Sequence, residues 1–226
     1  MNTAHRFWVT ASTNGLGAAL VEQLVHQQAC VAASGRDNLQ FHAMARRHGR
    51  RLLALSGTPD QQAAGLRQEW GVLDTLIVNA GTCDYLPADI ADSQILHALI
   101  TTNVQALERY LEAAMPLLLK APRPQVVVIL NLYTACKLSE PCLPASPASS
   151  LPERLRERRA TLRTAGIDLT IVTPHSQHAP WNTQRIPEHW TAQTAAAEIL
   201  SKVPERREEL VLEALGLRTL WPLKSV

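Results

Sequence analysis

The sequence predicts an α/β protein built on a doubly wound parallel sheet, with three α/β/α layers and about seven strands. Short apolar runs alternate with amphipathic segments of ten or more residues along the chain, which is typical of parallel βαβ units. A turn with two glycines separates the first apolar run from the first amphipathic segment. No internal repeat, linker or shift in composition divides the chain. We therefore expect a single domain over residues 1–226.

Strands are expected where bulky apolar residues form short runs: residues 6–10, 30–34, 52–55, 73–78, 126–132, 169–172 and 210–212. Helices are expected where apolar residues recur every three or four positions, as Leu16, Leu20 and Leu24 do in residues 15–28. The other expected helices are one capped by Asp37, and residues 60–70, 93–119, 151–164 and 191–202. In such a sheet, ligands bind beyond the carboxyl ends of the strands.

The chain has 226 residues, of which 46% are hydrophobic and 19% charged, so it should fold into a globular unit. Lys and Arg number 22 against 20 Asp and Glu, a balance that gives no basis for nucleic-acid binding. Apolar runs such as residues 126–130 are too short to span a bilayer, and the amino terminus lacks a signal peptide's apolar core. Four cysteines without a CxxC pair are typical of reduced thiols. We expect a cytoplasmic protein with neither a nucleic-acid nor a membrane partner.

Residues 10–17, with the sequence TASTNGLG, form the expected turn between the first strand and the first helix. Glycines at such a turn let the backbone approach a pyrophosphate, and the helix amino terminus supplies N–H donors and positive potential. A tight turn that binds no ligand would contain the same two glycines. The turn is therefore a candidate dinucleotide site whose alternative is a purely structural role.

This turn resembles the TGxxxGxG segment of the short-chain dehydrogenase/reductase family, with Ala11 in the place of the first glycine. Residues 78–81 (VNAG) resemble the family's NNAG motif, and Asn103 falls where the family keeps a structural and catalytic asparagine. Residues 166–174 resemble the strand before the family's Pro-Gly loop. The resemblance covers essentially the whole chain and implies a Rossmann-like fold. It also implies a set of cofactor-binding residues: Thr10, Ser12, Asn14, Gly15, Leu16, Gly17, Arg36, Asn79, Ala80, Gly81 and Pro174.

Arg36 follows the second expected strand, where an acidic side chain would bind the 2′-hydroxyl of NAD. An arginine suits the 2′-phosphate of NADP instead. We therefore expect NADP(H) rather than NAD. Two alternatives stay open, namely that Arg36 is a solvated surface residue and that the cleft binds no cofactor. Ala11 and His175, which replace family glycines, could each narrow that cleft.

The family's catalytic serine, tyrosine and lysine are missing from their expected positions. In the family the tyrosine hydroxyl transfers a proton, the lysine lowers the pKa of that tyrosine, and the serine orients the substrate carbonyl. The fifth expected strand ends ILNL without a hydroxyl, and the spacing back from Gly166 places the tyrosine at residues 144–145, which are Pro and Ala. Tyr133 and Lys137 have the YxxxK spacing but lie about 11 residues too early. Together with Asn103 they are the candidate catalytic residues; the alternative is a loop tyrosine packed on the strand ends.

Three functions follow from these observations. The first, which we favour, is a short-chain dehydrogenase/reductase-like protein that binds NADP(H) and a partner or small ligand but has lost standard hydride transfer. The second is an NADP-dependent oxidoreductase with rebuilt catalytic residues. The third is a non-redox enzyme that uses Tyr85, Tyr133 or His175 as acid or base. A metal pair at His175 and His178 is disfavoured because no carboxylate lies nearby in the sequence.

Residues 153–159, in the expected helix after the fifth strand, include six charged side chains. In the family this helix and the one that contains Asn103 commonly build the dimer interface. A charged helix is unlike a flat apolar face, and it indicates a monomer or a homodimer formed elsewhere. A basic surface for an acidic protein partner is the alternative.

Overall fold

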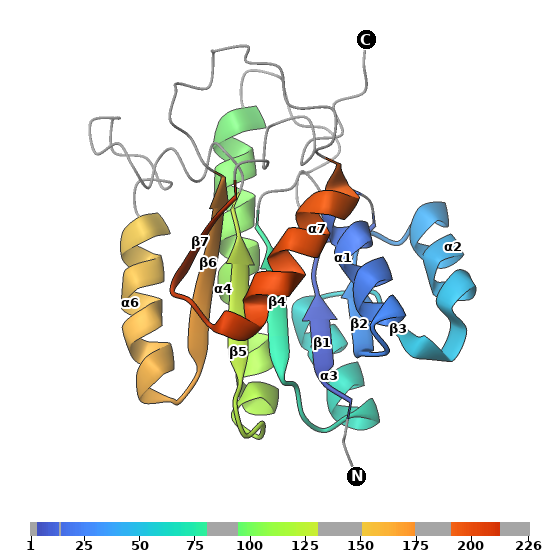
Figure 1. The fold of residues 1–226 in the computed structure, drawn as a ribbon, viewed down its shortest axis with the longest axis horizontal. Helices are drawn as coiled ribbons and strands as arrows, with labels where there is room; N and C mark the ends of the chain where they lie inside the picture. The colour runs from blue at the N-terminus through green and yellow to red at the C-terminus, as the bar shows by residue number, and fades with distance from the viewer. Residues whose placement is uncertain (1–3, 14, 81–94, 131–150, 175–190, 213–226) are drawn as a thin grey trace.

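The computed structural model describes residues 4–13, 15–80, 95–130, 151–174 and 191–212. Its seven strands form one parallel sheet in the order β3-β2-β1-β4-β5-β6-β7 (Figure 1). The strands are β1 (Arg6–Val9), β2 (Cys30–Ser34), β3 (Leu52–Leu55), β4 (Thr75–Asn79), β5 (Gln125–Ile129), β6 (Asp168–Pro174) and β7 (Glu209–Leu212). The α-helices are α1 (Gly15–His26), α2 (Leu39–His48), α3 (Pro59–Glu69), α4 (Ile95–Leu118), α6 (Leu151–Thr164) and α7 (Ala192–Lys202). The expected doubly wound α/β fold is confirmed.

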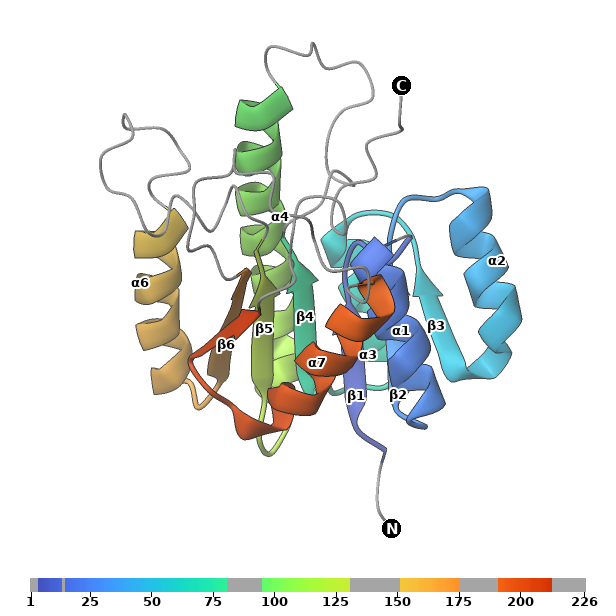
Figure 2. The ribbon, with the colours of Figure 1, turned by 45° about the horizontal axis from the view of Figure 1, so that its top comes forward.

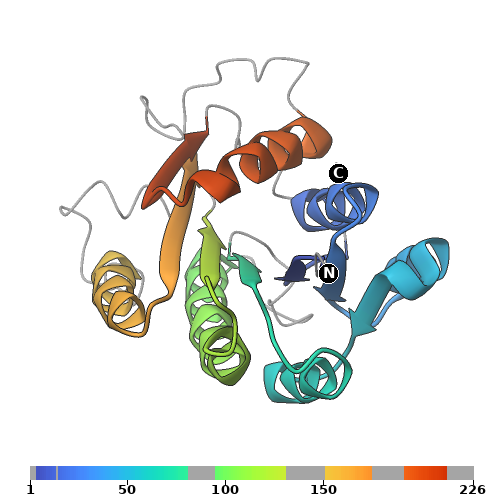
Figure 3. The ribbon, with the colours of Figure 1, turned by 60° about the horizontal axis from the view of Figure 1, so that its bottom comes forward.

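Two helical layers cover the sheet. Helices α1, α2 and α7 pack on one face, and α3, α4 and α6 pack on the other (Figure 3). Neighbouring strand residues alternate between the two layers: Trp8 belongs to the core beside α3 and α4, whereas Val9 belongs to the core beside α1. Because both faces are covered, every residue of β4 and β5 is buried. This explains why these strands form continuous apolar runs in the sequence rather than an alternating pattern.

The observed elements lie within a few residues of the expected ones, and one helix cap differs. Asn38, not Asp37, caps α2: its side-chain oxygen accepts a hydrogen bond from the Phe41 N–H at 2.9 Å. Asp37 Oδ1 instead lies 2.6 Å from His42 Nε2. Both residue types are good caps, so the sequence could not decide between two adjacent candidates. The backbone path from β2 selects the second one.

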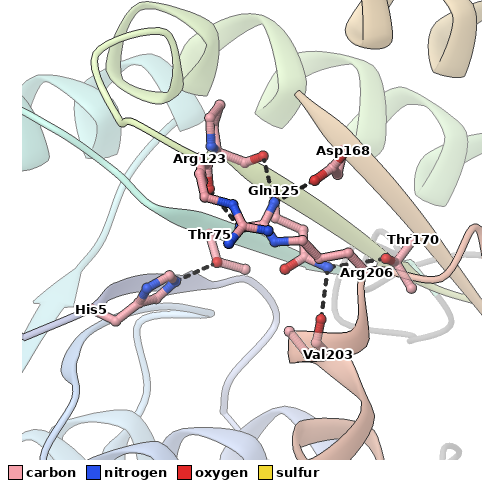
Figure 4. A network of polar contacts seen from close by, with 9 residues as sticks. His5, Thr75, Arg123, Gln125, Asp168, Thr170, Val203 and Arg206 are labelled. Carbon is pink, nitrogen blue, oxygen red and sulfur yellow. Dashed lines mark hydrogen bonds and ion pairs between the residues drawn. The ribbon is translucent and has the colours of Figure 1, made fainter. Parts of the chain in front are cut away.

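A network of polar contacts joins the amino ends of β5 and β6 to the segment before β7 (Figure 4). Gln125, which is 2% exposed, donates from Nε2 to Thr170 Oγ1 and to the Val203 carbonyl, both at 3.1 Å. Arg206 forms an ion pair with Asp168 and donates to carbonyls of the turn before β5. Buried polar groups need such partners, so this end of the sheet is held together by its own side chains.

His5 lies at the edge of the same network. Its Nε2 is 2.7 Å from Thr75 Oγ1, and its ring centroid is 4.6 Å from that of Phe7. Burial of the ring lowers the pKa of His5 below its ordinary value of 6.5; the Asp74 carboxylate opposes this shift, and Arg206 adds to it. The folded protein therefore favours neutral His5.

A lowered histidine pKa makes the protein less stable in acid. As the pH falls from about 6.5 toward the folded-state pKa, the unfolded chain binds more protons than the folded one, so the free energy of unfolding decreases. His5→Gln keeps a side chain that can hydrogen-bond to Thr75 but cannot titrate. The free energy of unfolding of this variant should therefore decrease less than that of the wild type between about pH 7.5 and about pH 5, as measured by urea unfolding. His48, whose pKa is also lowered by burial, retains its own contribution. An identical pH dependence in variant and wild type would contradict the prediction.

Candidate functional site

The strand order reverses between β1 and β4, which lie side by side at the centre of the sheet. Hydrogen bonds join the strand ends at this point. The Thr10 N–H donates to the Ile77 carbonyl at 3.0 Å, and Thr10 Oγ1 accepts from the Asn79 N–H at 3.1 Å. The Ala80 N–H donates to the Ile129 carbonyl at 2.8 Å. Three predicted site residues, Thr10, Asn79 and Ala80, thus meet at the switch point, where doubly wound sheets bind ligands.

The glycine turn after β1 is closed by a backbone contact. A Cβ atom on Gly17 would lie 2.1 Å from the carbonyl oxygen of Ala11, so any larger residue at position 17 would displace the turn. Ala11 has a φ of 50°, a region that favours glycine. The Ser12 hydroxyl donates to the Val9 carbonyl at 2.7 Å, and the Ser12 N–H donates to the Ser34 carbonyl at 2.8 Å. Both polar groups of Ser12 therefore hold the turn itself.

The carboxyl end of β2 packs against this turn. A Cβ atom on Gly35 would lie 2.8 Å from Thr13 Cγ2 and 3.2 Å from Thr13 N. Arg36 is the next residue, and it is exposed. The contact therefore places a guanidinium-bearing residue beside the glycine turn, and the role of Arg36 in selecting a cofactor stays a prediction.

The role of Trp8 at this site is not evident from the sequence. Its indole N–H donates to Ser34 Oγ, and its ring meets that of Tyr110 edge-on, with centroids 5.4 Å apart. Trp8 is in register with Ala32, so Ser34 follows two residues later on the same face of the sheet. One feature of the sequence points to this contact: Ser34 ends an apolar run, and a buried hydroxyl needs a hydrogen-bond partner. Trp8 thus links β1, β2 and α4 close to the crevice.

Asn79 has an unusual environment. It is 4% exposed, and its Oδ1 has no hydrogen-bond partner within the described part of the chain. Leaving a buried acceptor unpaired costs about 1–3 kcal/mol, and a hydroxyl group of a ligand would satisfy it. The predicted catalytic residue Asn103 is 1% exposed and lies in α4, whose first turns extend beyond the carboxyl ends of β4 and β5 (Figure 2).

The end of β5 and the helix after it carry apolar and charged residues. Val128, Ile129 and Leu130 are fully buried, and the Leu130 N–H donates to the Val172 carbonyl at 2.9 Å. Helix α6 contains neither tyrosine nor lysine. These two described elements therefore supply no phenol or ammonium group for proton transfer.

Several predicted residues lie outside the described ranges, and their roles stay predictions: Asn14, Gly81, Tyr85, Tyr133, Lys137, His175 and His178. Pro174 ends β6 and is paired with Leu212 in the sheet. Gly15 opens α1 with a φ of 53°. The Leu16 side chain is 2% exposed and belongs to the core beside α1, so only its backbone could contact a cofactor.

Three arginines of α6, namely Arg158, Arg159 and Arg163, are paired within the chain. Arg158 donates from Nε to Glu108 Oε2 of α4 at 3.0 Å. Arg159 and Arg163 both form ion pairs with Glu208, just before β7. These contacts neutralise part of the charge that the sequence suggested for an acidic partner. They also attach α6 to the two elements on either side of it.

The described ranges contain no group of three or more His, Cys, Asp or Glu side chains that could hold a metal ion. Their helices include none that is long and apolar enough to cross a membrane. The structure brings together three groups of predicted site residues. They lie in the glycine turn, at the end of β2 and at the switch point between β1 and β4. This arrangement defines a doubly wound α/β protein with a glycine turn at its switch point, the place where such sheets bind ligands.

Comparison with protein families is consistent with this class. The model of the short chain dehydrogenase family matches residues 6–140, which is more than half of the chain. The chain belongs to the short-chain dehydrogenase/reductase family.

The chain is similar to the cis-2,3-dihydrobiphenyl-2,3-diol dehydrogenase of Pseudomonas putida, with 29% identity over 154 residues, 57% of this chain and 54% of the relative. It is also similar to a cis-toluene dihydrodiol dehydrogenase of Pseudomonas putida, with 29% identity over 150 residues. The chain spans about half the length of these curated relatives.

Solved structures resemble the fold over nearly the whole chain. A short-chain dehydrogenase from Streptomyces avermitilis gives a TM-score of 0.71 at 18% identity, covering 97% of this chain and 92% of that one. A metagenomic short-chain oxidoreductase in complex with NADP gives a TM-score of 0.67 at 19% identity, covering 94% and 98%. At such low identities the likeness establishes the fold alone.

Gly17→Ala should disrupt the glycine turn. The added Cβ meets a backbone oxygen that cannot move without shifting β1 or α1, so we expect a loss of about 2 kcal/mol or more in the free energy of unfolding, measured in urea. Gly65→Ala in α3 is the matched control, because its Cβ meets only the tip of the Leu55 side chain, at 3.2 Å. That variant should be unchanged or more stable by up to about 1 kcal/mol. Equal effects of the two substitutions would show that the turn is not under this constraint.

Proposed function

We propose that this protein binds NADP(H) at the glycine turn and lacks the standard hydride-transfer chemistry of its family. The observation that carries the proposal lies in the sequence: the tyrosine positions expected from the family spacing, residues 144–145, are Pro and Ala, and the fifth expected strand ends ILNL without a hydroxyl. Helix α6, which follows, adds neither tyrosine nor lysine. In the whole sequence no tyrosine follows Tyr133, and no lysine lies between Lys137 and Lys202. The protein would then act by binding a small ligand or a protein partner rather than by reducing or oxidising a substrate.

Residues around the adenosine half of the crevice fit a dinucleotide. The contact between Gly17 and Ala11 places the amino terminus of α1 at the turn, where its N–H groups suit a pyrophosphate. The buried Oδ1 of Asn79 can accept a hydrogen bond from a ribose hydroxyl. Arg36 suits a 2′-phosphate because a guanidinium can bind phosphate through two parallel hydrogen bonds. A bound nicotinamide would supply a hydride donor or acceptor. Membership of the family, one of whose structural neighbours holds NADP, supports a nicotinamide cofactor in general but not the choice between NADP(H) and NAD.

Retained oxidoreductase activity is the second candidate. It is favoured by the burial of Asn103 in α4 and by the curated relatives, which are dehydrogenases of cis-dihydrodiols. In that case Tyr133 would exchange the proton with the substrate, and Lys137 would lower the pKa of that tyrosine. Cofactor binding alone does not separate the two candidates, so turnover must be measured as well.

NADPH should bind with a micromolar dissociation constant and quench the tryptophan fluorescence, because Trp8 is bonded to Ser34, two residues before Arg36. NADH, without the 2′-phosphate, should bind about tenfold or more weakly. Arg36→Glu should remove this preference. Arg67→Glu, the same charge change at an exposed position of α3, should preserve it.

Two results of this titration would contradict the proposal. If neither nucleotide binds, the glycine turn is not a nicotinamide site, and a protein partner becomes the expected ligand. If NADPH and NADH bind equally in the wild type, Arg36 does not select the cofactor.

With NADP⁺ and cis-2,3-dihydrobiphenyl-2,3-diol, the protein should form no NADPH above the background rate. NADPH should not be oxidised above the background rate with small ketones and aldehydes either. The described parts of β5 and α6 hold no proton donor of the family type. Turnover that disappears in Tyr133→Phe would establish the rebuilt enzyme instead. The purified wild type and Tyr133→Phe should first be shown to bind NADPH equally.

A further inference from the structure

A cavity of about 560 Å³ lies at the amino ends of β2 and β3. It is bounded by the ends of α1 and α3 and by the 3-10 turn η1 (Gly49–Arg51). The glycine turn lies at the other end of the same strands. The five residues of β2 span about 13 Å at a rise of about 3.3 Å per residue. The cavity is therefore separate from the dinucleotide crevice.

The walls of the cavity include two apolar side chains from one face of the sheet. Trp70, directly after α3, is partly buried and packs against the main core, and so does Leu53 of β3. Val31 of β2 also lines the cavity, but it is fully buried and belongs to the core on the other face of the sheet, so Trp70 and Leu53 supply the apolar contacts. A volume of this size falls within the range of small-molecule sites. An indole at the edge of such a space offers a planar ligand a stacking partner.

The rim of the cavity is charged. Arg50 and Arg51, both in η1, are exposed and line the cavity. Within the described ranges neither guanidinium has an ion-pair or hydrogen-bond partner. Glu69, at the end of α3, lines the cavity as well, without pairing to either arginine. The rim thus combines two positive groups and one negative group, and it favours an anion.

We propose that this cavity binds an aromatic carboxylate. The ring lies against Trp70 and Leu53, and the carboxylate accepts charge-assisted hydrogen bonds from Arg50 and Arg51. A small inorganic anion would leave the apolar wall uncovered, and a neutral aromatic compound would leave the guanidinium groups unpaired. Glu69 repels the carboxylate and limits the affinity. This proposal does not depend on the assignment of the dinucleotide crevice.

The test is calorimetric titration of the full chain with 2-naphthoate. We expect one equivalent to bind, with the same affinity in the presence and absence of saturating NADPH. Acetate, which has the charge without the ring, and 2-naphthylmethanol, which has the ring without the charge, should each bind at least about tenfold more weakly. Competition between 2-naphthoate and NADPH, or equal binding of 2-naphthylmethanol, would overturn the proposal.

Variants at the rim give effects of opposite sign. The double variant Arg50→Gln/Arg51→Gln should weaken 2-naphthoate binding at least about tenfold, because both charge-assisted contacts are lost. Glu69→Gln should strengthen binding about two- to threefold by removing a like charge. Arg46→Gln/Arg67→Gln, with the same loss of charge at exposed positions outside the cavity lining, should leave the affinity unchanged.

The substituted positions are exposed, so a thermal unfolding curve close to that of the wild type should accompany each variant. An unchanged affinity in Arg50→Gln/Arg51→Gln would overturn the proposal. So would an equal loss in the Arg46→Gln/Arg67→Gln control, since the effect would then reflect overall charge rather than this cavity.

Discussion

The approach of the Gly17 backbone to the carbonyl of Ala11 is the contact on which the ligand end of this protein depends. It seats α1 against the end of β1 with no side chain between them. The turn so formed is then joined to β2, because the Ser12 N–H bonds to the Ser34 carbonyl and Gly35 packs on Thr13. Ala11 has a positive φ, a backbone conformation that favours glycine. The turn therefore keeps its shape although an alanine occupies this position.

The two ends of the sheet have different roles because all seven strands run parallel. Every carboxyl end reaches the same edge, which gathers the glycine turn, Arg36 and Asn79 around one switch point. At the amino ends of β5 and β6, Gln125 and Arg206 tie the strands to the segment before β7. The cavity beside Trp70 lies at this second edge. A ligand there and a dinucleotide at the first edge would therefore not compete for space.

The fold does not require the family's catalytic residues. The core beside β4, β5 and β6 is made of aliphatic side chains, and α6 is attached through Leu155 and through the ion pair between Arg158 and Glu108. The packing of α6 therefore involves no tyrosine or lysine of that helix. Fold and function can separate in this way because the chemistry resides in a few side chains grafted on a stable scaffold.

The sequence alone determined the chain order and type of every described strand and α-helix. Both sheet faces are buried, so the strands are short apolar runs, and the helices show apolar residues every three or four positions. It also indicated that Thr10, Gly17, Arg36 and Asn79 lie near the carboxyl ends of the strands. It could not show the Trp8 bond to Ser34 or the unpaired Oδ1 of Asn79, because these depend on which strands become neighbours. The cavity at η1 could not be predicted from the sequence either. It is formed by segments distant along the chain, which only the tertiary structure brings together.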